Sequence, residues 1–87
     1  MQWQIVWDLD DDPDGNVQHI AEHGVTQEEV EEVLFGSISN TVVSRTSTNQ
    51  LTFGYTHAGR YLAVVWEHVM DDPLTIFPVT AYDAPEP

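Results

Sequence analysis

The chain has 87 residues, with 2 Lys+Arg against 15 Asp+Glu, so its formal net charge at pH 7 is −13 and its pI is about 4.1. So few cations cannot replace the counterions of a phosphate backbone, which makes DNA, RNA and anionic membranes poor partners on charge alone. With no cysteine, the chain cannot form a disulfide scaffold, a thiolate metal site or a cysteine nucleophile. No signal peptide or membrane-spanning run is recognisable, so we expect a cytoplasmic protein. We expect one domain over 1–84 and a frayed tail at 85–87.

An alternating apolar pattern opens the chain. Trp3, Ile5 and Trp7 fall on one face of an extended segment, which predicts a half-buried strand over 3–7. Residues 8–15 follow with five acids, one proline and one glycine, a composition that favours a solvated loop.

Two helices are predicted next. The apolar spacing after residue 15 predicts a helix of two turns, with Asn16 at its N-cap and Gly24 just past its end. Thr26 and Glu29 form a T-x-x-E capping box that starts the second helix, and Gly36 marks the expected exit of that helix. Its exposed face is expected to carry four glutamates: Glu28, Glu29, Glu31 and Glu32.

The second half of the chain is rich in β-branched and aromatic residues broken by turn residues. It predicts four strands, near 40–47, 50–57, 60–69 and 74–82. The segment 60–69 is apolar on both faces, so it should be the central strand. The order of elements predicts an α+β fold in which an antiparallel sheet carries both helices on one face. The opposite face would stay partly open and carry aromatic residues, which suggests a partner.

Several short motifs lie on these elements. They are Ile-Val-Trp-Asp at 5–8, His-Gly-Val-Thr at 23–26 followed by Glu28-Glu29, Gly-Tyr-Thr-His-Ala-Gly-Arg-Tyr-Leu-Ala-Val-Val at 54–65, and Val-Thr-Ala at 79–81. In these motifs the chain resembles the BrnT family of small bacterial toxins, which belong with the RelE-like ribonucleases of toxin–antitoxin pairs. The resemblance implies a RelE/BrnT-like fold over nearly the whole chain. It also implies a protein partner, a small DNA-binding antitoxin.

The resemblance implies a chemistry as well. Such toxins cleave RNA without a metal, through basic and polar residues on the open sheet face. Arg60 would then stabilise the negative charge of the developing phosphorane, while His57 or His23, or alternatively His68, would transfer protons. The other interpretation is that Arg60 pairs with neighbouring carboxylates.

The chain also departs from the family pattern. Glu22 stands where the family usually has a lysine, and Tyr82 and Asp83 stand where it has arginines. A ribonuclease with a charge of −13 would repel its substrate at long range. These departures favour binding over catalysis.

Two patterns are similar to known metal sites. Asp10, Asp12 and Asp14 match the start of a calcium loop, but Ala21 stands where that loop needs a bidentate glutamate, so the alternative is a solvated acidic turn. His19 and His23 have the i, i+4 spacing of a zinc pair without a third ligand marked by spacing. We therefore predict no metal and no cofactor.

The sequence thus favours a small partner-binding protein, either the toxin-like half of a toxin–antitoxin pair or a derivative without nuclease activity. Two alternatives stay open: an active metal-independent ribonuclease, and an acidic nucleic-acid mimic that occupies a basic protein groove. The residues expected at the partner-binding surface are Arg60, Trp66, Tyr82, Glu28 and Glu32.

Overall fold

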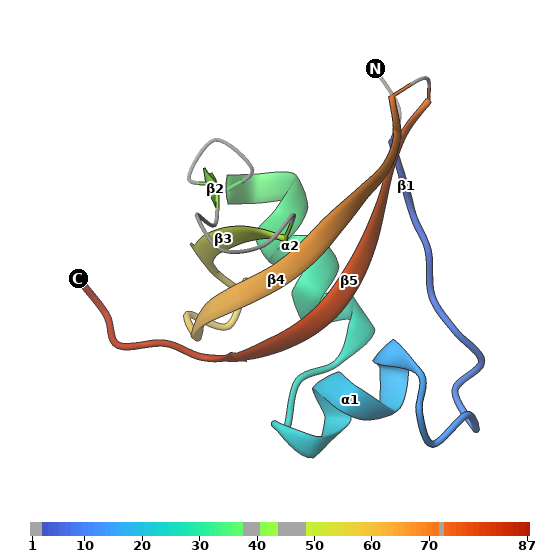
Figure 1. Cartoon of the computed structure of the whole chain (residues 1–87). Coiled ribbons are helices and arrows are strands. Elements are labelled where there is room, and N and C mark those ends of the chain that lie inside the picture. Colours follow the sequence, from blue (N-terminus) through green and yellow to red (C-terminus); the bar gives the residue numbers. More distant parts are fainter. Residues whose placement is uncertain (1–2, 38–40, 44–48, 72) are drawn as a thin grey trace.

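The computed structural model describes residues 3–37, 41–43, 49–71 and 73–87 (Figure 1). The chain forms two helices and five strands in the order β1, α1, α2, β2, β3, β4, β5. Their bounds are Trp3–Ile5 for β1, Asn16–Glu22 for α1, Gln27–Ser37 for α2, Thr41–Val43 for β2, Gln50–Tyr55 for β3, Tyr61–Asp71 for β4 and Leu74–Asp83 for β5. The predicted α+β class is confirmed.

The five strands form one mixed sheet in the order β1-β5-β4-β3-β2. The last four make the predicted antiparallel meander, and β4 is central as expected. The prediction of a purely antiparallel sheet is wrong, because β1 pairs in parallel with β5, Trp3 opposite Leu74 and Ile5 opposite Ile76. Parallel neighbours need a long connection, and here the helices and three strands supply it. The alternation of β1 predicted a strand but contained no information on its direction.

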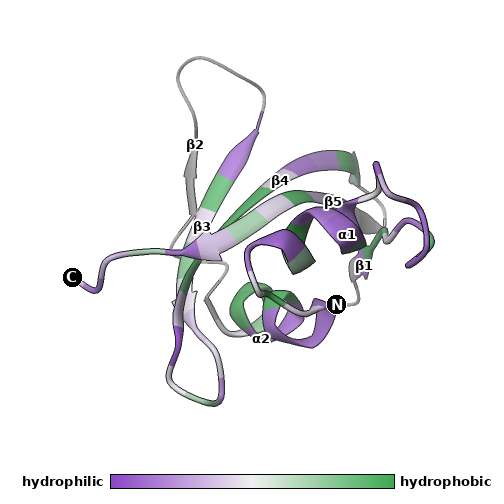
Figure 2. Cartoon of the chain, turned by 90° about the horizontal axis from the view of Figure 1, so that it is seen from below, coloured by the Kyte–Doolittle hydropathy of each residue, from purple (hydrophilic) through white to green (hydrophobic). Residues whose placement is uncertain are grey.

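Both helices cover the same face of the sheet, as predicted (Figure 2). Leu62, Val64 and Trp66 of β4 are buried and pack with the apolar side chains of the helices. The resulting core cluster consists of Ile20, Val25, Val30, Val33, Leu34, Leu62, Val64, Trp66, Ile76 and Ala81. Among the described residues, no helix has the length and apolar character that a bilayer crossing requires.

The start of α1 differs from the prediction. Gly15 is the N-cap, without a side-chain cap hydrogen bond, and Asn16 lies inside the helix with only 3% of its surface exposed. Its side chain instead donates to the carbonyls of Val6 and Pro78, each at 3.0 Å. Asn16 therefore joins β5 and the segment after β1 to α1. At the other end Gly24 has φ +72, the left-handed conformation predicted for the residue after a helix.

The capping box of α2 is confirmed. The Thr26 hydroxyl accepts from the Glu29 N–H at 3.1 Å, and the Glu29 carboxylate accepts from the Thr26 N–H at 3.0 Å. The predicted exit at Gly36 is wrong by at least one residue, because α2 continues to Ser37 and Gly36 does not have a positive φ.

The predicted strand boundaries agree with the structure to within a few residues where these are described. Of the strand expected at 40–47, only 41–43 are described, and they form β2. The register of β4 against β5 shifts between Val65 and Trp66, where Trp66 is opposite Pro78. A proline has no N–H for the sheet ladder, so an irregular position of this kind accommodates it.

Candidate functional site

The backbone of Arg60 is fixed by the turn that joins β3 to β4. The Thr56 N–H donates to the Arg60 carbonyl at 2.8 Å, and the Arg60 N–H donates to the Thr56 hydroxyl at 3.1 Å. Gly59 adopts φ +88 in this turn, a conformation that glycine takes without steric cost. The turn places Arg60 immediately before β4.

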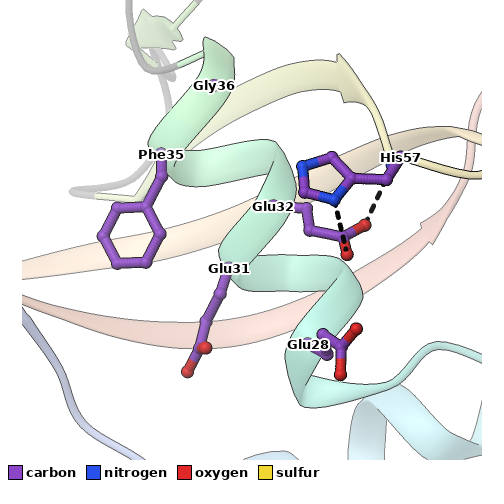
Figure 3. Close-up of a pocket in the computed structure, with 6 residues that line it drawn as sticks. All are labelled: Glu28, Glu31, Glu32, Phe35, Gly36 and His57. Atoms are coloured by element: carbon purple, nitrogen blue, oxygen red, sulfur yellow. Dashed lines mark hydrogen bonds and ion pairs between the residues drawn. The ribbon is translucent and has the colours of Figure 1, made fainter.

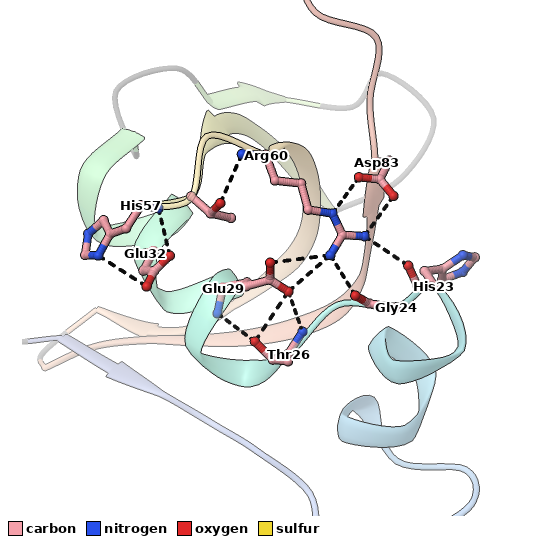
Figure 4. A network of polar contacts seen from close by, with 9 residues as sticks. His23, Gly24, Thr26, Glu29, Glu32, His57, Arg60 and Asp83 are labelled. Atoms are coloured by element: carbon pink, nitrogen blue, oxygen red, sulfur yellow. Dashed lines mark hydrogen bonds and ion pairs between the residues drawn. The ribbon is translucent and has the colours of Figure 1, made fainter.

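The guanidinium of Arg60 is surrounded by oxygen atoms (Figure 4). Its Nε and Nη2 donate to the two carboxylate oxygens of Asp83 at 2.7 and 2.8 Å. Nη1 donates to the Gly24 carbonyl at 2.7 Å and to Glu29 at 3.2 Å, and Nη2 also donates to the His23 carbonyl at 3.3 Å. One side chain therefore joins the end of β5, the loop between the helices and the capping box of α2.

The protonation states follow from these contacts. The hydrogen bonds from Arg60 lower the pKa of the Asp83 carboxyl, with the opposite charge of the guanidinium acting in the same direction. The hydrogen bond to Asp83, together with the charges of Asp83 and Glu29, raises the pKa of Arg60 although partial burial opposes this. The positive charge of Arg60 is thus matched by two carboxylates.

The predicted catalytic residues are distributed around this network without forming a common site. The ring of His23 lies edge-on to the ring of Tyr82, with centroids 6.3 Å apart. The ring of His57 points to Glu32, with Nδ1 3.2 Å from the carboxylate, while the guanidinium of Arg60 points to Asp83 (Figure 4). His68 lies eight positions further along β4, roughly 25 Å away at the rise of a strand. The contact between Arg60 and His23 is made by the His23 carbonyl, which accepts from Nη2 at 3.3 Å.

The residues predicted for partner binding lie in three different environments. Trp66 is 4% exposed and its indole donates to the Thr52 hydroxyl at 2.8 Å, so it belongs to the core. Tyr82 is 37% exposed near the Arg60 network. Glu28 and Glu32 lie together on α2. The structure therefore divides the predicted set: Trp66 lies in the core, Tyr82 lies near Arg60, and the two glutamates share the surface of α2.

That surface is a shallow hollow along the outer side of α2 (Figure 3). We call it the α2 hollow, and it is lined by Glu28, Glu31, Glu32, Phe35, Gly36 and His57. Five of these residues follow the i, i+3, i+4, i+7 and i+8 spacing of one helix face. Phe35 is 54% exposed there, and three carboxylates line the same hollow.

Two of the three carboxylates are held by other elements. Glu31 accepts a hydrogen bond from the Trp7 indole at 3.1 Å. Glu32 accepts from the His57 N–H at 2.9 Å and lies 3.2 Å from the His57 ring. These contacts fix the direction of the two side chains.

The acidic loop is organised around one reciprocal pair. The Asp8 N–H donates to the Asn16 amide oxygen and the Asn16 N–H donates to the Asp8 carboxylate, both at 2.9 Å. Asp12 accepts from the Asp14 N–H at 3.0 Å. Within the described ranges, no group of three or more His, Asp or Glu residues is placed to hold a metal ion, so Asp10, Asp12 and Asp14 do not converge and His19 and His23 gain no third ligand.

Sequence reasoning missed the roles of Phe35 and Gly36. Val30, Val33 and Leu34 are the buried face of α2, and Phe35 falls outside that spacing, on the face of the glutamates. The helical period alone would have placed Phe35 among Glu28, Glu31 and Glu32.

Comparison with known protein families, with characterised proteins and with solved structures gives no match.

Proposed function

We propose that this chain is a small cytoplasmic partner-binding protein that recognises a cationic protein and does not cleave RNA. The observation that carries this proposal is the engagement of Arg60. It is the one lysine or arginine within the residues that the structure describes, and its guanidinium is bound by Glu29 and Asp83. A chain with a net charge of −13 and its described cation already paired has an acidic surface that attracts basic partners.

The same engagement argues against nuclease chemistry. Attack by a ribose hydroxyl develops negative charge on phosphorus, and a cation must be available to stabilise it. Arg60 would first have to leave Asp83, Glu29 and two backbone carbonyls, exposing those acceptors to water.

For the wider role we propose the toxin-like half of a toxin–antitoxin pair, or a derivative of one without nuclease activity. The support is the set of motifs shared with the BrnT family and an element order, strand, two helices and four strands, that suits a RelE/BrnT-like fold. The partner is then a small DNA-binding antitoxin, whose own basic surface complements the acidic chain.

The nuclease part of the proposal is tested with purified protein and a mixed-sequence RNA. We expect the RNA to stay intact at micromolar protein, and overexpression to leave growth unaffected. Degradation that disappears in Arg60→Ala but persists in a stability-matched variant such as Thr26→Ala would contradict the proposal and establish the ribonuclease alternative.

The partner part is tested by co-expression with the product of the adjacent reading frame. A complex that survives gel filtration, and that duplex DNA does not dissociate, supports the toxin–antitoxin pairing. If DNA competes with this chain for its partner, the acidic surface occupies a nucleic-acid groove, and the chain acts as a nucleic-acid mimic.

A further inference from the structure

The α2 hollow contains a glycine that the fold does not require. Gly36 lies within α2 and has no positive φ, and a Cβ built at this position meets no atom of the described residues within 4 Å, its chain neighbours and adjacent helix backbone aside. Glycine in a helix is less stable than alanine by roughly 0.5–1 kcal/mol because it loses more backbone entropy. Among the described residues, neither backbone conformation nor close packing explains Gly36, so the position leaves room beside the helix backbone.

The neighbouring aromatic ring is exposed at the same place. Phe35 keeps 54% of its surface accessible on a helix whose other apolar side chains, Val30, Val33 and Leu34, are fully buried. An accessible aromatic ring next to a position without a side chain is the arrangement of an interface anchor, because a partner can approach the helix backbone closely and pack on the ring.

The charges around the ring define what can approach it. Glu28, Glu31 and Glu32 line the same hollow as Phe35, and the described part of the chain places no lysine or arginine in it. Glu31 lies one helical turn, about 6 Å, from Phe35 along α2. In a partner segment whose apolar side chain packs on Phe35, a lysine or arginine one turn away from that side chain would therefore face Glu31.

We infer that the α2 hollow is the docking site for a cationic amphipathic segment of the partner protein, with an apolar side chain over Phe35 and Gly36 and basic side chains facing Glu28 and Glu31. This inference rests on the proposed partner-binding function and adds its location. The charge complementarity and the apolar anchor distinguish this segment from nucleic acid, which the three carboxylates of the hollow repel. They also exclude a second copy of this chain, whose matching face is equally acidic.

The inference is tested with a fluorescent amphipathic peptide of leucine and lysine, and with the same peptide carrying glutamine in place of lysine. Anisotropy is measured at low and at moderate NaCl. We expect the lysine peptide to bind, with an affinity that falls as salt rises, and the glutamine peptide to bind weakly or not at all.

Matched variants locate the site. Phe35→Ala is compared with Leu9→Ala, since Leu9 is 75% exposed in the acidic loop, and Glu28→Gln is compared with Glu22→Gln, which removes the same charge from α1. We expect Phe35→Ala and Glu28→Gln to weaken binding by about fivefold or more, as truncation of an interface anchor does, and the two control variants to change it by less than about twofold. Gly36→Leu should block the space and weaken binding while the thermal unfolding midpoint stays the same or rises.

The outcomes separate the two proposals. One outcome is that each control variant weakens binding as much as its partner in the hollow, and that Gly36→Leu binds as tightly as the unsubstituted protein. The attraction is then only long-range charge, and the α2 hollow is not the site. The partner-binding function would still stand. If the lysine peptide does not bind even at low salt, or an RNA oligonucleotide binds more tightly, the proposed function itself is overturned.

Discussion

Arg60 binds Asp83 side-on through two parallel hydrogen bonds, Nε to Oδ1 at 2.7 Å and Nη2 to Oδ2 at 2.8 Å. The two residues are 23 positions apart: Arg60 immediately precedes β4, and Asp83 is the last residue of β5. The bidentate geometry is specific for arginine, because a lysine ammonium has no planar pair of donors. The pair is therefore a structural link between the ends of two neighbouring strands.

This arrangement predicts the effect of changing Arg60. Arg60→Ala should lower the free energy of unfolding by about 1 kcal/mol, the upper end for partly exposed ion pairs, because one guanidinium holds several acceptors. Arg60→Lys should restore only part of this loss. Urea unfolding of the three proteins measures the difference, and a lysine variant as stable as the original would show that charge alone is sufficient.

The capping box predicts a second pair of effects. Thr26→Ala should lower the free energy of unfolding by about 1 kcal/mol, the usual loss of an N-cap. Glu29→Ala should lower it at least as much, because Glu29 also pairs with Arg60. A double-mutant cycle of Glu29→Ala with Arg60→Ala isolates that second contact, and strictly additive effects would show that the pair contributes nothing.

We expect substitution of the buried Asn16 to destabilise the protein more than substitution of any surface residue. Asn16→Ala leaves the carbonyls of Val6 and Pro78 without their donor, so stability should fall by about 1–3 kcal/mol. Asn16→Asp should lower the stability at least as much, because a carboxylate would face those two carbonyls. Gln18→Ala removes a similar amide from the exposed side of α1 and serves as the control. Equal unfolding midpoints for Asn16→Ala and Gln18→Ala would contradict the structural role of Asn16.

The Asp83 carboxyl predicts a pH dependence. The pKa of Asp83 in the folded state is lowered below the usual value of 3.8. The ion pair with Arg60 therefore contributes its full stability above pH 3.8. This contribution is lost as the pH falls through the lower pKa of the folded state. The difference in unfolding free energy between the unsubstituted protein and Asp83→Asn should therefore be constant near neutral pH and shrink below about pH 4. A difference that grows on acidification would reverse the assigned sign.

The charge of −13 predicts a dependence on salt. Repulsion between the negative groups is stronger in the compact state than in the expanded chain, and salt screens it over a Debye length of about 10 Å at 0.1 M. The melting temperature should rise from low to moderate NaCl. Calcium at matched ionic strength should add a small, non-saturating gain that magnesium reproduces. A saturable, calcium-selective rise that Asp12→Asn removes would instead establish a calcium site in the acidic loop.

The local elements were predictable because their signals are local. Thr26 and Glu29 are three residues apart, and the reciprocal capping contacts follow from helix geometry whatever the rest of the chain does. The same holds for Gly24 after α1 and for the two apolar faces that make β4 central. Composition likewise determined the acidic surface.

The tertiary structure decided what depends on distant partners. Asn16 has the side chain of a helix cap, but the approach of Val6 and Pro78 offered it two buried carbonyls, and it bonds to those instead. The parallel pairing of β1 depends on which edge of the meander stays open beside it. Arg60 was identifiable as a functional candidate from its motif, yet its partner Asp83 is 23 residues away, so only the folded chain determines that the cation is already bound. A sequence pattern specifies what a residue can do within a few turns of backbone, whereas its long-range contacts are specified by the packing of the whole chain.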